Sequence, residues 1–414
     1  MIEREGELMK INEKRFLERM DAINGVAMTE EGGMMRLALS DADKKARDLL
    51  KLWMVETGMD VRIDDLGSMV GYLPGSDKDA LAIGIGSHLD TQPNGGKYDG
   101  LYGVLAGLEA VCTLKDEGII TKSPLAIINW TNEEGARFVP PMLASGAVAG
   151  VFDAEWVHER KDNDGIKYID ELKRIGYLGS SDNRFTKAKA YIEPHIEQGP
   201  VLDMEKLSLG VVTGALGITG LDITITGEAN HAGTTPMGNR KDALMTASEV
   251  ILELREKIIE YGDPAVITIG IINAKPASKN IVPGEVYFSI DMRHDNDTDL
   301  IALEEDVKKI IKDVCKKNKL QVDIERYWKA EPVHFDKKIV NIVDKVVKNE
   351  TNKSTRITSG AGHDAVFMDR IMPTGMLFIP SINGMSHCPQ EETKIEDQII
   401  GVMALTEIIL EIDK

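Results

Sequence analysis

Residues 81–118 read LAIGIGSHLDTQPNGGKYDGLYGVLAGLEAVCTLKDEG. The stretch begins with an apolar run, residues 81–85, which predicts a buried strand. It passes through a polar loop rich in glycine into residues 98–117, where apolar side chains recur at helical spacing until Gly118 predicts a stop. A strand, a polar loop and a helix in this order predict a fold of the α/β class.

Three further apolar runs are each followed by a polar, glycine-bearing stretch. Residues 125–130 precede TNEEG, residues 190–192 precede EPHIEQG and residues 376–379 precede PSINGMSH. Reactive groups in open α/β sheets gather beyond the carboxyl ends of the strands, so we expect the polar side chains after these runs to form one cluster. The candidates are His88, Asp90, Asp99, Glu133, Glu134, His195 and His387.

The order of the expected elements indicates two domains. Residues 1–213 and 330–414 alternate strands with helices, which predicts a catalytic domain with a mixed sheet flanked by helices. Residues 214–329 follow the βαββαβ order of a ferredoxin-like fold and are expected to form a domain inserted into the first. The expected inserted elements are a strand at 221–226, a helix at 241–259, strands at 265–273 and 285–291, a helix at 300–317 and a strand at 321–327. Apolar and polar residues alternate in the first of these strands, so one face of its sheet should be wet or covered only by its own helices.

Composition and charge exclude several classes of partner. The chain has 414 residues, of which 49 are basic and 68 acidic, and its net charge of −19 repels nucleic acid phosphates and anionic lipid. Its apolar runs all fall short of the about 20 residues that are needed to span a bilayer. We therefore expect neither a nucleic acid partner nor a membrane partner.

The amino-terminal sequence and the cysteines indicate in which cellular compartment the protein is expected. The amino-terminal sequence MIEREGELMKINEKRF is charged throughout, and we expect no signal peptide. Cys112, Cys315 and Cys388 are odd in number and far apart in sequence, which argues against a disulfide framework and for a reducing compartment. We therefore expect a cytoplasmic protein, with Cys112 and Cys315 buried within helices.

The expected cluster of histidines and carboxylates predicts a binuclear metal centre. Two cations about 3.5 to 4 Å apart need a bridging carboxylate, for which Asp99 is the candidate. His88, His195, Glu134 and His387 then supply two further ligands for each ion. Imidazoles and carboxylates suit Zn²⁺ or Mn²⁺ and also accept Co²⁺ or Ni²⁺. Such a centre activates water for attack on a carbonyl carbon, which predicts amide-type hydrolysis.

Two more carboxylates have expected roles beside the metals. Asp90 lies two residues after His88, on the same side of an extended segment, and is expected to orient the imidazole ring. Glu134 can bind metal while Glu133 turns toward the attacking water as general base. Each residue alone has a structural alternative, because Asp99 could cap the following helix and a single histidine could be a hydrogen-bonded core residue. Their joint occurrence after strands favours the metal centre.

Eight motifs of the chain resemble those of one enzyme family. They are GSHLDTQPNGGKYDG, TNEEGARF, EPHIEQGPVL, GEANHAGTTPM, KNIVPGE, DMRH, SGAGHDA and PSINGMSHCPQE. They are similar, over nearly the whole chain, to motifs of the M20 metallopeptidase superfamily in its branch of N-carbamoyl-L-amino-acid hydrolases and allantoate amidohydrolases. The resemblance implies a catalytic domain with two metals and an inserted lid domain through which related proteins form homodimers.

The resemblance also implies roles for individual residues. One metal would be held by His88, Asp99 and His195, the other by Asp99, Glu134 and His387, with Glu133 as the base. His231 would stabilise the oxyanion, and Asn280 and Arg293 would hold the substrate carboxylate, which a planar guanidinium suits. Gln198 would contact the ureido group or lie near the metals. Without the resemblance, Arg293 could equally be an exposed salt-bridging arginine on a strand. Some lid residues of relatives come from the partner subunit, so dimerisation is expected to complete the site.

The chain departs from the family at Cys388, because relatives more often have serine after the last ligand histidine. A thiol at this position bears on metal preference and on sensitivity to oxidation, and it could itself become a ligand. A small buried filler is the structural alternative.

We predict hydrolysis of an N-carbamoyl-L-amino acid, or a related ureido acid, at a carbon–nitrogen bond other than a peptide bond. The products would be the amino acid, ammonia and carbon dioxide. Allantoate is an alternative substrate because it also joins a ureido group to a carboxylate, and a dipeptidase or aminoacylase of the same superfamily is another alternative. A metal-binding protein without catalytic activity is the remaining hypothesis, which Glu133 disfavours because a binding module needs no general base.

Overall fold

The computed structural model describes residues 10–414, and the chain divides into two compact units. The first unit holds the chain up to Thr213 and again from Phe335 to Lys414, and the second holds Gly214–His334. The second unit ends at residue 334 rather than at the expected 329, because Val333 and His334 pair with Ala215 and Gly214 at the start of the unit. Residues 1–9, on which part of the signal-peptide expectation rests, lie outside the described residues.

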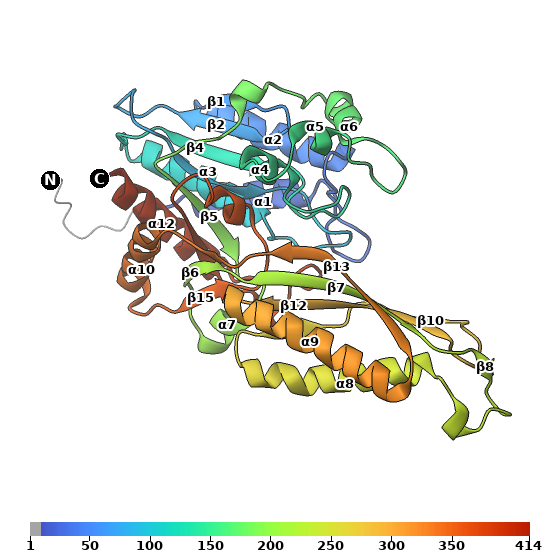
Figure 1. Cartoon of the computed structure of the whole chain (residues 1–414). Helices are drawn as coiled ribbons and strands as arrows, with labels where there is room; N and C mark the ends of the chain where they lie inside the picture. The colour runs from blue at the N-terminus through green and yellow to red at the C-terminus, as the bar shows by residue number, and fades with distance from the viewer. Residues whose placement is uncertain (1–9) are drawn as a thin grey trace. The chain divides into compact units, whose positions relative to one another are not determined.

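The larger sheet has nine strands in the order β1-β2-β4-β3-β5-β16-β6-β14, with β15 paired to β6. Strands β3, β4, β5 and β16 pair in parallel, whereas β1, β2, β6 and β14 pair antiparallel to their neighbours. The bounds are β1 (Asp60–Ile63), β2 (Met69–Leu73), β3 (Ile83–His88), β4 (Leu125–Trp130), β5 (Ala190–Ile196), β6 (Gly210–Ala215), β14 (Val333–His334), β15 (Arg356–Ser359) and β16 (Thr374–Ile379). The predicted mixed α/β sheet is confirmed (Figure 1).

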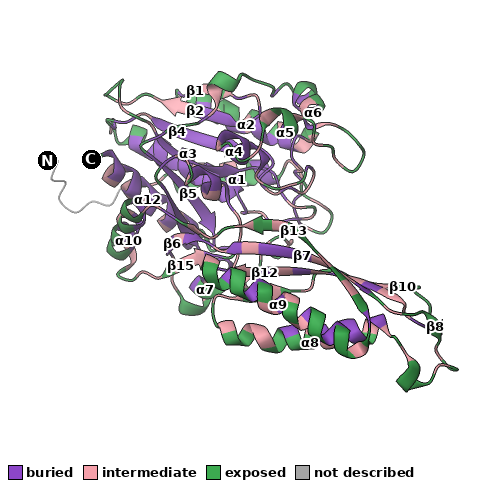
Figure 2. Cartoon of the chain, in the orientation of Figure 1, coloured by how far each residue is buried: buried purple, intermediate pink, exposed green. Residues whose placement is uncertain are grey.

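Helices cover this sheet, and the four parallel strands are buried along their whole length (Figure 2). Sheets of this kind carry continuous apolar runs because both faces are covered. The helices are α1 (Glu13–Asn24), α2 (Asp41–Glu56), α3 (Leu101–Asp116), α4 (Leu143–Val148), α5 (Ala154–His158), α6 (Tyr168–Ile175), α7 (Val201–Glu205), α10 (Lys337–Thr351), α11 (Asp364–Met368) and α12 (Ile395–Asp413). Short 3₁₀ turns lie at Ser181–Asn183, Met237–Asn239, Ile259–Tyr261 and Ile382–Gly384.

Helix α3 differs from its prediction in two respects. It begins at Leu101 rather than Tyr98, because Gly100 precedes it with a φ of 64°. It is buried all round from Leu101 to Leu114 instead of along one stripe, since β3, β4 and β5 lie on one side and α1 and α12 on the other. Two glycines permit this packing, because a Cβ on Gly103 would lie 2.2 Å from the carbonyl oxygen of Pro194, and one on Gly107 would lie 2.8 Å from Ile85.

The second unit contains an antiparallel sheet of five strands in the order β10-β12-β7-β13, with β9 also paired to β12. Its elements are β7 (Gly217–Thr226), α8 (Ala243–Ile258), β9 (Val266–Thr268), β10 (Ile272–Lys275), β12 (Glu285–His294), α9 (Asp297–Asn318) and β13 (Gln321–Ala330). A separate pair is formed by β8 (Asn230–His231) and β11 (Ile281–Val282). The strand predicted at 265–273 is split in two around Gly270, a residue type that weakens strand interiors.

The core of the second unit lies between its sheet and its two helices. Leu221, Ile223 and Ile225 of β7 are fully buried and belong to the same apolar cluster as residues of α8 and α9. Asp222 and Thr224, which alternate with them, are only partly buried. The predicted alternation is therefore confirmed, with one face of the sheet covered by its own helices.

Among residues 10–414, no helix combines the length and the apolar character that crossing a membrane requires. All three cysteines lie in this part of the chain and are free. Cys112 and Cys315 are buried, as predicted, and Cys388 is partly buried.

Candidate metal centre

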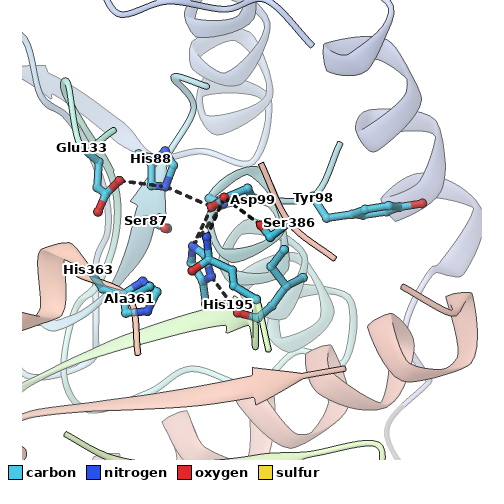
Figure 3. A network of polar contacts seen from close by, with 12 residues as sticks. Ser87, His88, Tyr98, Asp99, Glu133, His195, Ala361, His363 and Ser386 are labelled. Atoms are coloured by element: carbon cyan, nitrogen blue, oxygen red, sulfur yellow. Dashed lines mark hydrogen bonds and ion pairs between the residues drawn. The ribbon is translucent and has the colours of Figure 1, made fainter. Parts of the chain in front are cut away.

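The carboxylate of Asp99 lies between two sets of side chains (Figure 3). Its Oδ1 is 3.6 Å from Nε2 of His88 and 3.2 Å from Nε2 of His195. Its Oδ2 is 3.0 Å from Nε2 of His387. Each carboxylate oxygen thus faces a different set of potential ligands, which is the arrangement that a bridge between two cations requires.

The structure brings all five expected metal ligands together in two groups that share Asp99. His88, Asp99 and His195 offer ligand atoms that lie within 4.8 Å of one another, and so do Asp99, Glu134 and His387. The first group is buried, whereas the side chain of His387 is 47% exposed. Histidine and carboxylate donors in such groups fit divalent cations of the zinc and manganese type.

The two buried histidines present the correct nitrogen to a cation. His88 ends β3 and His195 lies within β5, so each belongs to a parallel strand rather than to the loop after it. Nδ1 of His88 is 2.9 Å from the carbonyl oxygen of Asp90, and Nδ1 of His195 is 2.9 Å from that of Ile196. Because a carbonyl oxygen only accepts, Nδ1 carries a proton in both rings, and Nε2 is the nitrogen that faces Asp99 and that a cation would bind.

Gly100 makes room for the first group. A Cβ at this position would lie 2.4 Å from ring atoms of His88, so glycine is required for space as well as for the φ of 64°. Gly100 is also the N-cap residue of α3. The structural alternative for Asp99, a capping carboxylate, therefore does not hold, because its carboxylate faces the histidines instead.

Asp90 contacts His88 and the two adjacent glutamates. Its carbonyl oxygen orients His88, while its carboxylate Oδ1 lies 3.9 Å from Nδ1 of that ring. The same carboxylate accepts hydrogen bonds from the N–H groups of Glu133 at 3.3 Å and Glu134 at 3.2 Å. The carboxylate of Asp90 thus fixes the backbone of the two glutamates. From the sequence, the role predicted for Asp90 was to orient the imidazole ring of His88.

The adjacent glutamates point to different neighbours. Oε2 of Glu133 lies 3.5 Å from Nε2 of His88, and burial raises the pKa of Glu133 well above its usual value. Glu134 is held by Gln92, whose backbone N–H and side-chain amide donate to its two carboxylate oxygens at 3.1 and 2.8 Å. Burial and the charge of Asp99 raise the pKa of Glu134 to about 7. Gln92 was not predicted, and it lies in the polar loop that follows His88.

The carboxylates of this cluster favour the protonated, positively charged form of the neighbouring histidines. Burial alone would lower the pKa of His88, but Glu133 and Asp99 outweigh it and raise that pKa well above its usual value. The hydrogen bond to Asp99 raises the pKa of His387 to about 9. Despite burial, hydrogen bonds from His195 and the other two imidazoles hold the pKa of Asp99 well below its usual value. Cations that replace these protons would satisfy the same carboxylates.

Sequence reasoning missed a buried polar layer behind the first group. The rings of His363 and His195 have centroids 4.5 Å apart, and Glu193, His195 and His363 form a third group within 4.8 Å. Glu193 accepts hydrogen bonds from the Ser87 hydroxyl at 2.8 Å and the Ala365 N–H at 2.7 Å. Two signals were available, since Glu193 lies on the same side of β5 as His195 and His363 follows a strand in a glycine-bearing loop.

The expected oxyanion donor His231 and the expected substrate-binding residues Gln198, Asn280 and Arg293 lie in three places. The Nε2 amide of Gln198 donates to Oδ2 of Asp99 at 2.8 Å and lies 3.2 Å from Nε2 of His387. His231 and Asn280 are brought together by β8 and β11, where the Ala232 N–H donates to the carbonyl oxygen of Asn280 at 2.9 Å. Gln198 belongs to the first unit, and His231 and Asn280 to the second.

Arg293 lies apart from His231 and Asn280 within the second unit. It pairs with Ile218 near one end of β12, whereas Glu285 at the other end, next to β11 in sequence, pairs with Thr226. The eight residue steps between Glu285 and Arg293 span roughly 26 Å of strand. Nε of Arg293 donates to Oδ1 of Asp291 at 2.8 Å, so the arginine forms an ion pair on its strand.

Comparison with known proteins places the chain in a family. Residues 84–411 match the peptidase family M20/M25/M40. An N-carbamoyl-L-amino-acid amidohydrolase of Rhizobium meliloti is 39% identical over 406 residues, which cover 98% of each chain. An allantoate amidohydrolase of Bacillus subtilis (strain 168) is 36% identical over 381 residues, 92% of each chain. A crystal structure of a hydantoinase/carbamoylase family amidase from Burkholderia multivorans superposes with a TM-score of 0.93 at 38% identity and 98% coverage of both chains.

The chain therefore belongs to the peptidase family M20/M25/M40. Within that family it groups with amidohydrolases of carbon–nitrogen bonds, and it is an enzyme of this class. The hypothesis of a metal-binding protein without catalytic activity is thereby set aside.

Proposed function

We propose that this enzyme hydrolyses N-carbamoyl-L-amino acids to the amino acid, ammonia and carbon dioxide. The observation that carries the proposal is the pair of ligand groups that share Asp99, with the carboxylate of Glu133 beside them. The 39% identity to an N-carbamoyl-L-amino-acid amidohydrolase over 98% of both chains supports the choice of substrate.

The two groups would hold two divalent ions per subunit, Zn²⁺ or Mn²⁺, with Co²⁺ or Ni²⁺ also suited to the donors. His88, Asp99 and His195 are the proposed ligands of one ion, and Asp99, Glu134 and His387 those of the other. When bound, such ions lower the pKa of water and polarise a carbonyl oxygen. Cys388 is not needed in this scheme, because each group is complete without it.

Glu133 is the proposed general base. Water adds to the ureido carbon, its proton passes to Glu133, and Glu133 then gives the proton to the nitrogen that leaves. The carbon–nitrogen bond breaks and leaves a carbamate, which decomposes to ammonia and carbon dioxide. Asp90 supports this role by holding the backbone N–H of Glu133. Burial raises the pKa of the Glu133 carboxyl well above its usual value, and a higher pKa makes its carboxylate a stronger base.

His231 is the proposed oxyanion donor, and its tautomer suits the task. Its Nδ1 accepts hydrogen bonds from the N–H groups of Gly233 at 3.1 Å and Thr234 at 3.2 Å. Two donors at Nδ1 leave the proton on Nε2, which can then donate to the oxygen that develops negative charge. Asn280 and Arg293 would hold the substrate carboxylate, and Gln198 would contact the ureido group.

We infer that the second unit is a ferredoxin-like lid that also forms a homodimer. The order β7, α8, β9 with β10, β12, α9 and β13 supports the βαββαβ assignment, with one strand split. Two observations support a second copy of the chain. The β12 register separates Arg293 from His231 and Asn280, so one copy would supply the arginine and its partner the other two. In addition, Met245, Leu252 and Ile259 are exposed at heptad spacing along α8 and the turn after it.

Allantoate is the second candidate substrate. It is favoured by the 36% identity to an allantoate amidohydrolase over 92% of both chains. Both candidates carry a ureido group and a carboxylate, so the same residues would recognise either of them. We also propose a cytoplasmic location, which the three free cysteines support.

The function is tested by substrate competition after removal of metal with a chelator. Protein with and without added Mn²⁺ or Zn²⁺ is incubated with N-carbamoyl-L-amino acids, allantoate, a dipeptide and a neutral ureido compound that lacks a carboxylate, and the released ammonia and amino acid are measured. We expect metal-dependent turnover that is fastest with an N-carbamoyl-L-amino acid. Faster turnover of allantoate would favour the second candidate, and cleavage of the dipeptide alone, or equal turnover of the neutral compound, would refute both.

A further inference from the structure

Glu391 joins the loop that carries Asp99 to the loop that carries His387. The residue is buried, with 1% of its surface exposed. Its Oε1 accepts hydrogen bonds from the N–H groups of Tyr98 at 2.9 Å and Asp99 at 3.1 Å. Its Oε2 accepts from the Ser386 hydroxyl at 2.7 Å and from the N–H of His387 at 3.3 Å. One carboxylate therefore holds the backbone at two of the proposed metal ligands.

Gly96 leaves space for this carboxylate. A Cβ on Gly96 would lie between 1.9 and 2.1 Å from the carboxylate atoms of Glu391. The backbone of Gly96 lies outside the positive-φ region, so its conformation does not itself require glycine. Glycine at residue 96 therefore leaves the space that the Glu391 carboxylate occupies. Gly96 lies in the same loop as Asp99.

Four hydrogen-bond donors surround the side chain of Glu391, and only a carboxylate can accept from all four through two oxygens. An ionised carboxylate only accepts hydrogen bonds, whereas a glutamine amide has one accepting oxygen and one donating nitrogen. A glutamine in this place would turn an N–H donor toward either the Asp99 loop or the His387 loop, and that pair of contacts would be lost. The backbone of His387 depends on such support, because it adopts a φ of 56°, which is uncommon for a residue other than glycine.

We propose that Glu391 is a positioning residue for the metal centre, which holds Asp99 and His387 in the geometry that lets them share one cation. This inference rests on the proposed function. Glu391 acts through the two loops and takes no part in the reaction itself. Groups that orient metal ligands from behind typically change metal affinity or activity by about 10- to 100-fold when they are replaced.

The test compares three variants by metal affinity. Chelator-stripped wild type, Glu391→Gln, Gly96→Ala and Glu392→Gln are titrated with Zn²⁺ and Mn²⁺ in a calorimeter, and circular dichroism confirms their folding. Glu391→Gln removes the charge and one set of contacts, whereas Gly96→Ala keeps the charge but displaces the carboxylate. Glu392→Gln is the matched control, since Glu392 is exposed and accepts a hydrogen bond from the Tyr98 hydroxyl at 2.7 Å.

We expect Glu391→Gln and Gly96→Ala each to weaken binding of the metal by about 10- to 100-fold, while Glu392→Gln stays within about twofold of wild type. With metal in excess, kcat should fall and KM should change by less than about threefold, because the substrate contacts remain in place. If Glu391→Gln fails to fold, the metal affinity of Gly96→Ala tests the inference alone. Gly96→Ala is expected to fold because its added Cβ clashes only with the flexible end of the Glu391 side chain. Wild-type affinity in both variants would overturn the inference alone, whereas absence of metal binding by the wild type would overturn the proposed function together with it.

Discussion

Nε2 of His387 lies 3.0 Å from Oδ2 of Asp99, on the opposite oxygen from the one that faces His88 and His195. The Asp99 carboxylate therefore interacts with a half-exposed imidazole on one side and with two buried imidazoles on the other. This asymmetry predicts that the two metal positions differ in their access to solvent and in their response to pH.

Binding of metal at the His387 group should strengthen as pH rises. The hydrogen bond to Asp99 raises the pKa of His387 from 6.5 to about 9. In the metal-free protein the protonated ring stabilises the fold fully below pH 6.5, and that contribution is lost as pH rises through about 9. A cation needs the neutral ring, so its apparent affinity should increase over the same window. Calorimetric titrations at the two ends of this window would measure the change, and an affinity that is flat or falls with pH would contradict it.

Replacement of Glu133 by glutamine should stop catalysis while leaving the metals in place. The amide cannot take a proton from water, so kcat should fall by at least about 100-fold. The ligand groups do not include Glu133, so the metal content should stay at the wild-type value. Ammonia release and metal analysis on the same preparation provide the two measurements. A rate near that of wild type would remove Glu133 from the role of base.

Replacement of Gly100 by alanine should disrupt the first ligand group. The added Cβ would lie 2.4 Å from the ring of His88, so the ring must move away from Asp99. Gly118→Ala is the control, because Gly118 has a similar φ of 66° but no heavy atom lies within 4 Å of the added carbon. Both variants carry the backbone strain of about 1 kcal/mol or more, and only Gly100→Ala should lose bound metal. Equal metal content in the two variants would show that the ring tolerates the clash.

Activity should return when two inactive variants share a dimer. If His231 comes from one copy and Arg293 from its partner, each single variant is inactive as a homodimer, but a mixed dimer has one intact site. Co-expression of His231→Ala with Arg293→Ala should then restore about a quarter of the wild-type activity, since about half of the dimers are mixed. Absence of recovery, with mixed dimers demonstrated by mass, would place both residues in the site of one chain.

The apolar runs and the polar stretches after them allowed the ligand set to be chosen from the sequence. Strand β4 spans the predicted residues 125–130, and the cluster of polar side chains forms where parallel strands end, as the sheet class requires. Local patterns were less informative about burial. The amphipathic appearance of α3 did not reveal that α12, almost 300 residues later in the chain, covers its second side.

Contacts between loops that are distant in the chain could not be predicted from the sequence. Glu391 accepts hydrogen bonds from the loop before α3, and Gln92 bonds to Glu134, but nothing local to these residues indicates either pairing. The same holds for Asp90. Its spacing from His88 predicted the His88 ring as its partner, whereas its carboxylate accepts hydrogen bonds from the N–H groups of Glu133 and Glu134. Short-range spacing predicts which side chains share one side of a strand, and it does not predict which loops meet.

The most direct test of the account is activity toward an N-carbamoyl-L-amino acid as metal is returned to chelator-stripped protein in measured amounts. Two cations that share Asp99 predict that turnover is absent in the stripped protein, rises as Mn²⁺ or Zn²⁺ is added and levels off at two ions per chain. Turnover that persists in the stripped protein, or that never appears at any amount of added metal, would contradict the account.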